Sequence, residues 1–87
     1  MRVKVRQIGK ALHPSEVVVE VQAADGTERL VVDRESIHGD TLSVGWPVAQ
    51  SKGRFLVELP RETMSGTWRV WVRKNQVVPE RESARAG

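Results

Sequence analysis

Hydrophobic residues recur at every second position in six segments of this chain, and no segment shows a sustained helical period. A period of two places alternate side chains on opposite faces of a β-strand, so each segment has one apolar face and one polar face. The predicted strands cover residues 2–8, 16–22, 28–34, 41–49, 54–59 and 67–74. This pattern predicts an all-β protein made of short antiparallel strands.

The inward-facing residues of these strands form the predicted core. Trp68 faces inward from the last strand, and in the first strand Val3 and Val5 share the side opposite its basic residues. Trp68→Ala is therefore expected to lower the free energy of unfolding by ~3–5 kcal/mol. The other predicted core residues share the inward parity of their strands: Val17, Val19, Val21, Leu30, Val32, Leu42, Val44, Trp46, Phe55, Val57, Leu59, Val70 and Val72.

Short polar connections separate the strands. Asp25 and Gly26 lie between two alternating runs, and this dipeptide favours a hairpin with a type I′ turn. Residues 50–53 predict a second hairpin loop. Residues 33–40 and 60–66 each suit a single helical turn. Pro47 removes a backbone donor, which predicts an edge strand or a bulge near Gly45.

Six short strands with tight connections predict a small antiparallel barrel or roll, SH3-like or OB-like, with one or two single-turn helical segments. Closure would place the last strand beside the first; an open roll or a sandwich is the alternative. Residues 1–78 form the predicted single β-domain. Residues 79–87 are charged and lack large apolar side chains, so a disordered C-terminal tail is expected there.

Composition argues against catalysis and against metal or cofactor binding. The chain has no cysteine, and its seven glycines are scattered singly, so it has no thiol chemistry and no glycine-rich phosphate loop. Ser36, His38 and Asp40 share one small loop, whereas a catalytic triad draws on separate elements. Asp33 and Glu35 with that loop match no metal-ligand spacing. We therefore expect no enzyme, no cofactor and no metal.

Hydropathy indicates where the protein is located, and charge indicates what kind of partner it binds. The chain has no apolar run long enough for a signal peptide or a membrane span, so a cytoplasmic protein without membrane contact is expected. The formal net charge is +3, and the basic residues gather near both ends of residues 1–78. Such asymmetry is typical of a polyanion site, although opposite charges that pair across strands give the same pattern.

The outward face of the last strand holds Trp71 between two arginines. If the first and last strands are neighbours, their outward faces form one basic stripe with an aromatic platform: Arg2, Lys4, Arg6, Arg69, Trp71 and Arg73. Small β-barrels bind single-stranded nucleic acid with such cations and rings, so the sequence favours a module that binds single-stranded RNA. Two alternatives remain open: a protein interface or homodimer on the same face, and a Trp71 that is merely covered by a loop.

Overall fold

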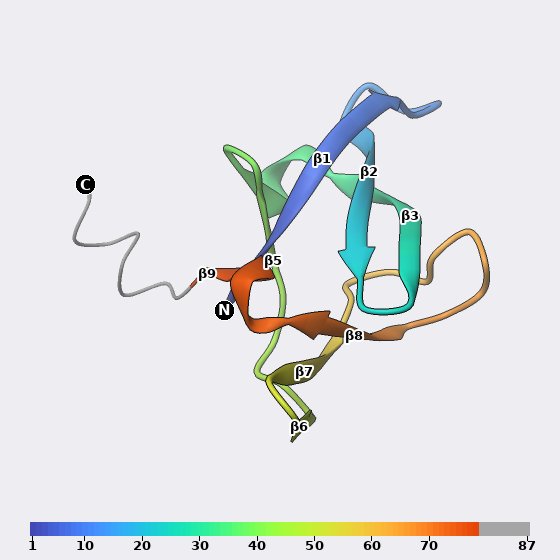
Figure 1. Ribbon diagram of the computed structural model, residues 1–87. Coiled ribbons are helices and arrows are strands. Elements are labelled where there is room, and N and C mark those ends of the chain that lie inside the picture. Colours follow the sequence, from blue (N-terminus) through green and yellow to red (C-terminus); the bar gives the residue numbers. More distant parts are fainter. Residues whose placement is uncertain (79–87) are drawn as a thin grey trace.

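The computed structural model describes residues 1–78, and the predicted disordered tail lies outside them. The chain forms antiparallel β-sheets with two 3₁₀ turns and no other helix in this range, which confirms the all-β prediction (Figure 1). The elements in chain order are β1 (Arg2–Lys10), β2 (Glu16–Ala23), β3 (Gly26–Asp33), η1 (Arg34–Ser36), β4 (Ile37–His38), β5 (Thr41–Ser43), β6 (Ala49–Ser51), β7 (Arg54–Glu58), β8 (Arg69–Arg73), η2 (Lys74–Gln76) and β9 (Val77–Val78).

The described strands form two sheets and do not close into a barrel. The first has the strand order β3-β2-β1-β5-β4, with β9 also paired to β1, and the second has the order β6-β7-β8. Strand β1 pairs with different strands along its length: its first residues pair with β5 and β9, and its remainder pairs with β2. The tryptophan strand β8 pairs only with β7 among the described strands. The expected pairing of the first strand with the tryptophan strand is therefore wrong, and β9 occupies that place beside β1.

The same arrangement of elements occurs twice along the chain. Strands β1, β2 and β3 followed by η1 and β4 correspond to β5–β6, β7 and β8 followed by η2 and β9. The residues before the two 3₁₀ turns, Asp33 and Arg73, have nearly the same backbone angles (φ −66, ψ 142 and φ −75, ψ 153). Each terminal strand pairs with the other half, β4 with β5 and β9 with β1. The chain thus consists of two topologically equivalent halves that exchange strands.

The core lies where the two halves meet. Val3 and Leu42 are directly opposite each other in the β1–β5 pair, and neither has any exposed area. The period-two prediction is confirmed for most positions, because alternate residues of β2, β3, β8 and the start of β1 are buried, while β7 buries Val57 alone. Val44 and Phe55 are partly buried and pack against this core. Removing water from these aliphatic side chains is the main force that holds the two halves together.

Trp46 is 81% exposed, so the prediction that it belongs to the core is wrong. The predicted strand 41–49 is interrupted, because β5 ends at Ser43 and β6 begins at Ala49. Between them, Gly45 weakens strand pairing and Pro47 cannot donate a ladder hydrogen bond. Once a segment leaves the sheet, alternation no longer determines which side chains face the core.

Trp68 is 55% exposed, which also contradicts its predicted burial. Strand β8 begins only at Arg69, although the Leu59 amide still donates to the Trp68 carbonyl (2.8 Å). Between these two residues the connection reaches β3, where the Met64 amide donates to the Arg29 carbonyl (2.8 Å). Leu59 and Thr63 are the buried residues of this connection. The indole Nε1 of Trp68 donates to the Glu62 carboxylate at 2.7 Å.

The exposure of Trp68 changes the expected effect of its replacement. Trp68→Ala removes one exposed hydrogen bond and opens no closed cavity, so we expect a loss of about 1 kcal/mol or less in the free energy of unfolding. Urea denaturation followed by far-UV circular dichroism measures this loss. A loss near the ~3–5 kcal/mol of a buried aromatic would contradict the exposed position.

Both predicted hairpins are present, but their turns differ from expectation. In the β2–β3 hairpin Ala23 pairs with Gly26, and neither Ala24 nor Asp25 has a positive φ, so the predicted type I′ turn is wrong. In the β6–β7 hairpin Ser51 pairs with Arg54, and both central residues, Lys52 (φ 48) and Gly53 (φ 76), have positive φ. Positive φ at both central positions is what a type I′ turn requires.

Candidate functional site

The structure divides the six residues of the predicted stripe between separate places. Arg2, Lys4 and Arg6 lie on β1, which does not pair with β8. Lys4 and Arg6 line a small hollow of about 220 Å³ together with Glu20, so their surroundings are not purely basic. Arg2 is half-buried. These three residues therefore do not continue the basic surface of β8 through strand pairing.

Arg69 lies on β8, but its charge is compensated. Its guanidinium contacts the Glu58 carboxylate through Nε and Nη2, both at 3.1 Å, and the two residues are directly opposite in the β7–β8 pair. An exposed cross-strand pair of this kind is a common stabilising contact. Of the predicted residues on β8, Trp71 and Arg73 remain as candidates.

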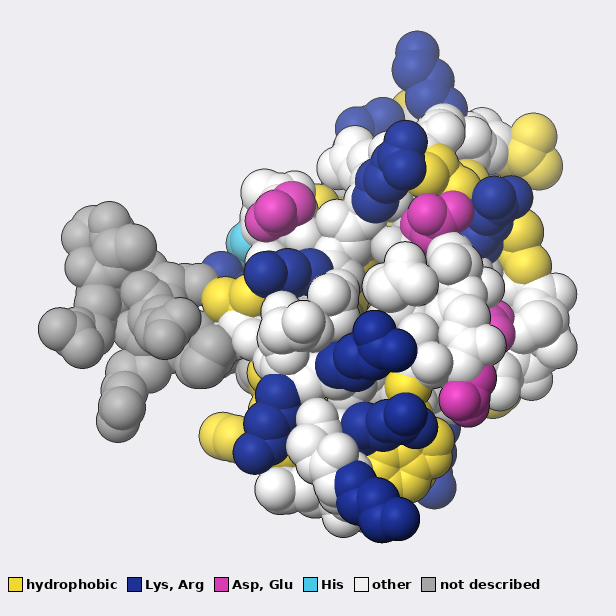
Figure 2. Space-filling view, in the orientation of Figure 1, with side chains coloured by type: hydrophobic (Ala, Val, Ile, Leu, Met, Phe, Trp, Pro, Cys, Tyr) yellow, Lys and Arg dark blue, Asp and Glu magenta, His cyan; other side chains and the backbone are white. Residues whose placement is uncertain are grey.

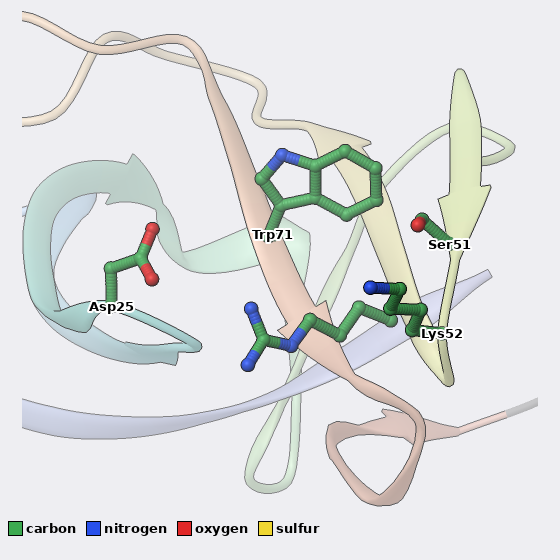
Figure 3. A pocket seen from close by; sticks show the side chains of 5 residues that line it. Asp25, Ser51, Lys52 and Trp71 are labelled. Atoms are coloured by element: carbon green, nitrogen blue, oxygen red, sulfur yellow. The ribbon is translucent and has the colours of Figure 1, made fainter.

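Trp71 is half-buried and lines an open hollow of about 490 Å³ between the two halves. Figure 3 shows Asp25, on the β2–β3 turn, on one side of the indole and Ser51 and Lys52, from the β6–β7 hairpin, on the other. The Ala24 amide donates to the Trp71 carbonyl (2.7 Å), which fixes the β2–β3 turn against β8. We call this set, together with the opposed arginines of β7 and β8, the Trp71 site: Asp25, Ser51, Lys52, Arg54, Trp71 and Arg73.

Two arginines of the Trp71 site are directly opposite each other. Arg54 on β7 pairs with Arg73 on β8 in the antiparallel ladder, so both side chains emerge on the same face as Trp71. Like charges in this position destabilise a strand pair. Within residues 1–78, neither guanidinium forms an ion pair or a hydrogen bond with another side chain. The repulsion is therefore not relieved by the described part of the chain.

The equivalent position in the first half shows how such a repulsion is relieved. There Glu16 on β2 is opposite Asp33 on β3, again two like charges before a 3₁₀ turn. Arg61 bridges them, with Nη1 at 2.6 Å from Glu16 and Nη2 at 3.3 Å from Asp33. The acidic pair thus has a counter-charge from the chain itself. The basic pair of Arg54 and Arg73 has no such partner among the described residues.

Lys52 adds a third cation at a position that lysine disfavours. It is the one non-glycine residue with positive φ in the described chain. Asn, Asp and Gly are the usual residues at this position of a type I′ turn, and a longer side chain costs roughly 1 kcal/mol there. The turn is anchored by the Gly53 carbonyl, which accepts from the Lys74 amide at 3.1 Å. The chain therefore carries a positive charge here despite a local cost in stability.

The aromatic part of the Trp71 site is partly accessible to a ligand. Leu56 is directly opposite Trp71 on the outward face, and both are partly accessible. Figure 2 shows Lys and Arg side chains clustered over the end of the molecule where β7 and β8 lie, with hydrophobic atoms exposed between them. A ring surrounded by cations offers a stacking surface and counter-charges for an anion.

Sequence reasoning identified Trp71 and Arg73 and missed the other members of the site. Arg54 has the outward parity of its strand, and Lys52 precedes it by two residues in a predicted hairpin loop. Pairing the strands 54–59 and 67–74 as a hairpin would have placed Arg54 near Arg73. No sequence signal points to Asp25, because only the contact between the two halves brings it to Trp71.

The loop that contains Ser36, His38 and Asp40 forms backbone contacts with neighbouring strands. The His38 carbonyl accepts from the Thr41 hydroxyl at 2.7 Å, and the Asp40 carbonyl accepts from the Val5 amide at 2.8 Å. Across residues 1–78, no group of three or more histidine and carboxylate side chains is placed to hold a metal ion. In the same range no helix is long and apolar enough to cross a membrane.

Comparison with known proteins identifies no relative of this chain. A scan against protein-family models returns no match to the chain, and searches of curated proteins and of solved structures return none either.

Proposed function

We propose that this protein is a non-catalytic binding module whose Trp71 site holds single-stranded nucleic acid. Arg54, Arg73 and Lys52 would contact the phosphates, and the indole of Trp71 would stack on an unpaired base. Such a division between cations for the backbone and rings for the bases is how small β-domains bind single strands.

One observation carries this proposal: among residues 1–78, no acidic side chain forms an ion pair with the arginine pair of β7 and β8. In the equivalent pair of the first half, Arg61 lies between Glu16 and Asp33. A phosphate between Arg54 and Arg73 would play the reciprocal part, since guanidinium groups form paired, charge-assisted hydrogen bonds with phosphate oxygens. Ligand binding would then relieve the cross-strand repulsion.

The tryptophan beside the cations favours a single strand over a duplex or a free phosphate. A ring can stack only on a base face that is not already covered by a neighbouring base pair. Asp25, on the side of the indole away from Lys52, would repel phosphate, which confines the backbone to the side of Lys52. Bases rather than phosphates would therefore face the β2–β3 turn.

Titration of a fluorescent single-stranded RNA at several salt concentrations tests the proposal. Three phosphate contacts predict a slope of log K against log salt near −2, because each contact contributes about −0.7 for single strands. A tight complex whose affinity is independent of salt would contradict the assignment of the three cations. No binding even at low salt would remove the proposed function altogether.

Replacing Trp71 by alanine is expected to weaken RNA binding by ~1–3 kcal/mol while leaving the salt slope nearly unchanged, because stacking releases no counterion. Trp68→Ala is the matched control, since that indole is exposed but lies outside the Trp71 site. Equal losses for the two variants in the same titration would show that the effect does not come from stacking at this site.

A protein interface on the same face predicts a different outcome. Trp71→Glu would then convert a dimer into a monomer in sedimentation experiments, and higher salt would leave the association intact or strengthen it. The salt dependence of RNA binding, together with the effect of Trp71→Glu on association, therefore separates the two functions.

A further inference from the structure

A second surface, away from the Trp71 site, is apolar and exposed. Leu12 in the β1–β2 loop is fully exposed, Met64 is 65% exposed, and Trp68 is more than half exposed. Val18 and Val31 are directly opposite each other on the outward face of the β2–β3 hairpin and are partly accessible. Single exposed hydrophobic residues are common, whereas several that adjoin one another usually mark an interaction site.

These residues form one continuous surface. A hollow of about 390 Å³ is lined by Leu12, Val18 and Val31, and a neighbouring one of about 520 Å³ is lined by Val31, Met64 and Trp68. Val31 belongs to both, so the two hollows adjoin along β3. In Figure 2, hydrophobic side chains are exposed along the margin that runs from the β1–β2 loop past β3. We call this surface the Val31 surface: Leu12, Val18, Val31, Met64 and Trp68.

The charged residues around the Val31 surface balance one another. The lining includes Lys10 and Arg61 against Glu16 and Glu62, two cations and two anions. Arg61 is bound to Glu16, and Glu62 accepts from the Trp68 indole. A surface without net charge gives no attraction for a polyanion. In a twofold dimer the same surface of both copies comes together, so a surface with balanced charges avoids repulsion between the copies.

We propose that two copies of this chain associate through the Val31 surface to form a symmetric dimer. A standard interface takes about 800 Å² from each partner, roughly a seventh of the 5799 Å² accessible surface of this chain. Trp68 and Met64 are suitable anchors, since tryptophan and methionine are enriched in interfaces.

The proposed dimer does not depend on the proposed function. The lining residues of the Val31 surface and those of the Trp71 site have no member in common. Each copy in the dimer would keep its own Trp71 site accessible, so association and RNA binding can be measured separately.

Sedimentation velocity of the wild type over a range of concentrations, compared with Leu12→Glu, tests the dimer. Leu12 has no buried area to lose, so its replacement leaves the fold intact. A twofold interface contains each substitution twice, and we expect the dissociation constant to rise roughly tenfold or more. Trp68→Glu should act in the same way and checks the other end of the surface.

Trp46→Glu is the matched control, because Trp46 is a highly exposed tryptophan that lies outside the Val31 surface. The proposal expects a wild-type dimer that Leu12→Glu and Trp68→Glu dissociate and Trp46→Glu does not. A wild type that remains monomeric at every concentration overturns it. A dimer that persists in both Val31-surface variants, or that Trp46→Glu dissociates equally, also overturns it, since another face would then form the contact.

Discussion

Replacing Leu42 by alanine is expected to lower the free energy of unfolding by about 2–5 kcal/mol, the largest stability effect of any single change proposed for this chain. Leu42 has no exposed area, and it lies between Val3 of β1 and Ile37 of β4. Its side chain therefore fills the junction at which the two halves exchange strands. A cavity at this junction weakens both halves together.

Urea denaturation monitored by circular dichroism measures this loss, with Leu12→Ala as the matched control. The same atoms are removed in both variants, but Leu12 is fully exposed, so its change should stay within about 0.5 kcal/mol of the wild type. The comparison requires a protein concentration at which the chain is monomeric, because any dimer would add its own stability. A Leu42→Ala loss of less than about 1 kcal/mol would show that the junction repacks or is not the centre of the core.

The second large effect is expected from Arg73→Glu, which should strongly weaken RNA binding while making the fold slightly more stable. A carboxylate opposite Arg54 replaces a repulsive cross-strand pair with an attractive one, worth roughly 0.2–1 kcal/mol in the free energy of unfolding. It also removes one phosphate contact and neutralises a second. Affinity at low salt should therefore fall roughly a hundredfold, and the salt slope should become shallower by about 1.4.

Arg29→Glu provides the control for Arg73→Glu because it changes the net charge by the same amount. Arg29 forms an ion pair with Glu20 at 3.2 Å on the first half, away from the Trp71 site. This change should lower stability by placing like charges opposite each other and should leave RNA affinity nearly unchanged. Opposite signs for stability and affinity in the Arg73 variant are the signature to look for. If both quantities fall together, Arg73 has a structural role.

The two halves show how one topology has acquired different surfaces. The apolar pair Val18–Val31 on the first half occupies the place of Leu56–Trp71 on the second. On the first half the neighbouring like charges are acidic and bridged by Arg61, whereas on the second they are basic and unbridged within the described chain. The proposed dimer surface and the proposed nucleic-acid site are thus equivalent faces of the two halves, separated in role by charge.

The period-two pattern alone determined the class of fold and most of the core. Burial alternates along a strand because successive side chains emerge on opposite faces, so Val17, Val19 and Val70 could be assigned to the core without any knowledge of strand partners. The same rule placed Trp71 and Arg73 on the outward face. A short polar loop that contains Gly53, between two alternating segments, also indicated the β6–β7 hairpin.

Tertiary structure decided where the alternation stops and which faces meet. Trp46 and Trp68 have the parity of core residues, but both lie where the chain has left its strand, and a local period contains no information about long-range hydrogen bonding. The exchange of β4 and β9 between halves placed β9 rather than β8 beside β1, which separated Lys4 from Trp71. The Trp71 site joins Asp25 from one half to Arg54 from the other. Such a contact depends on how the sheets pack, and packing depends on the whole chain at once.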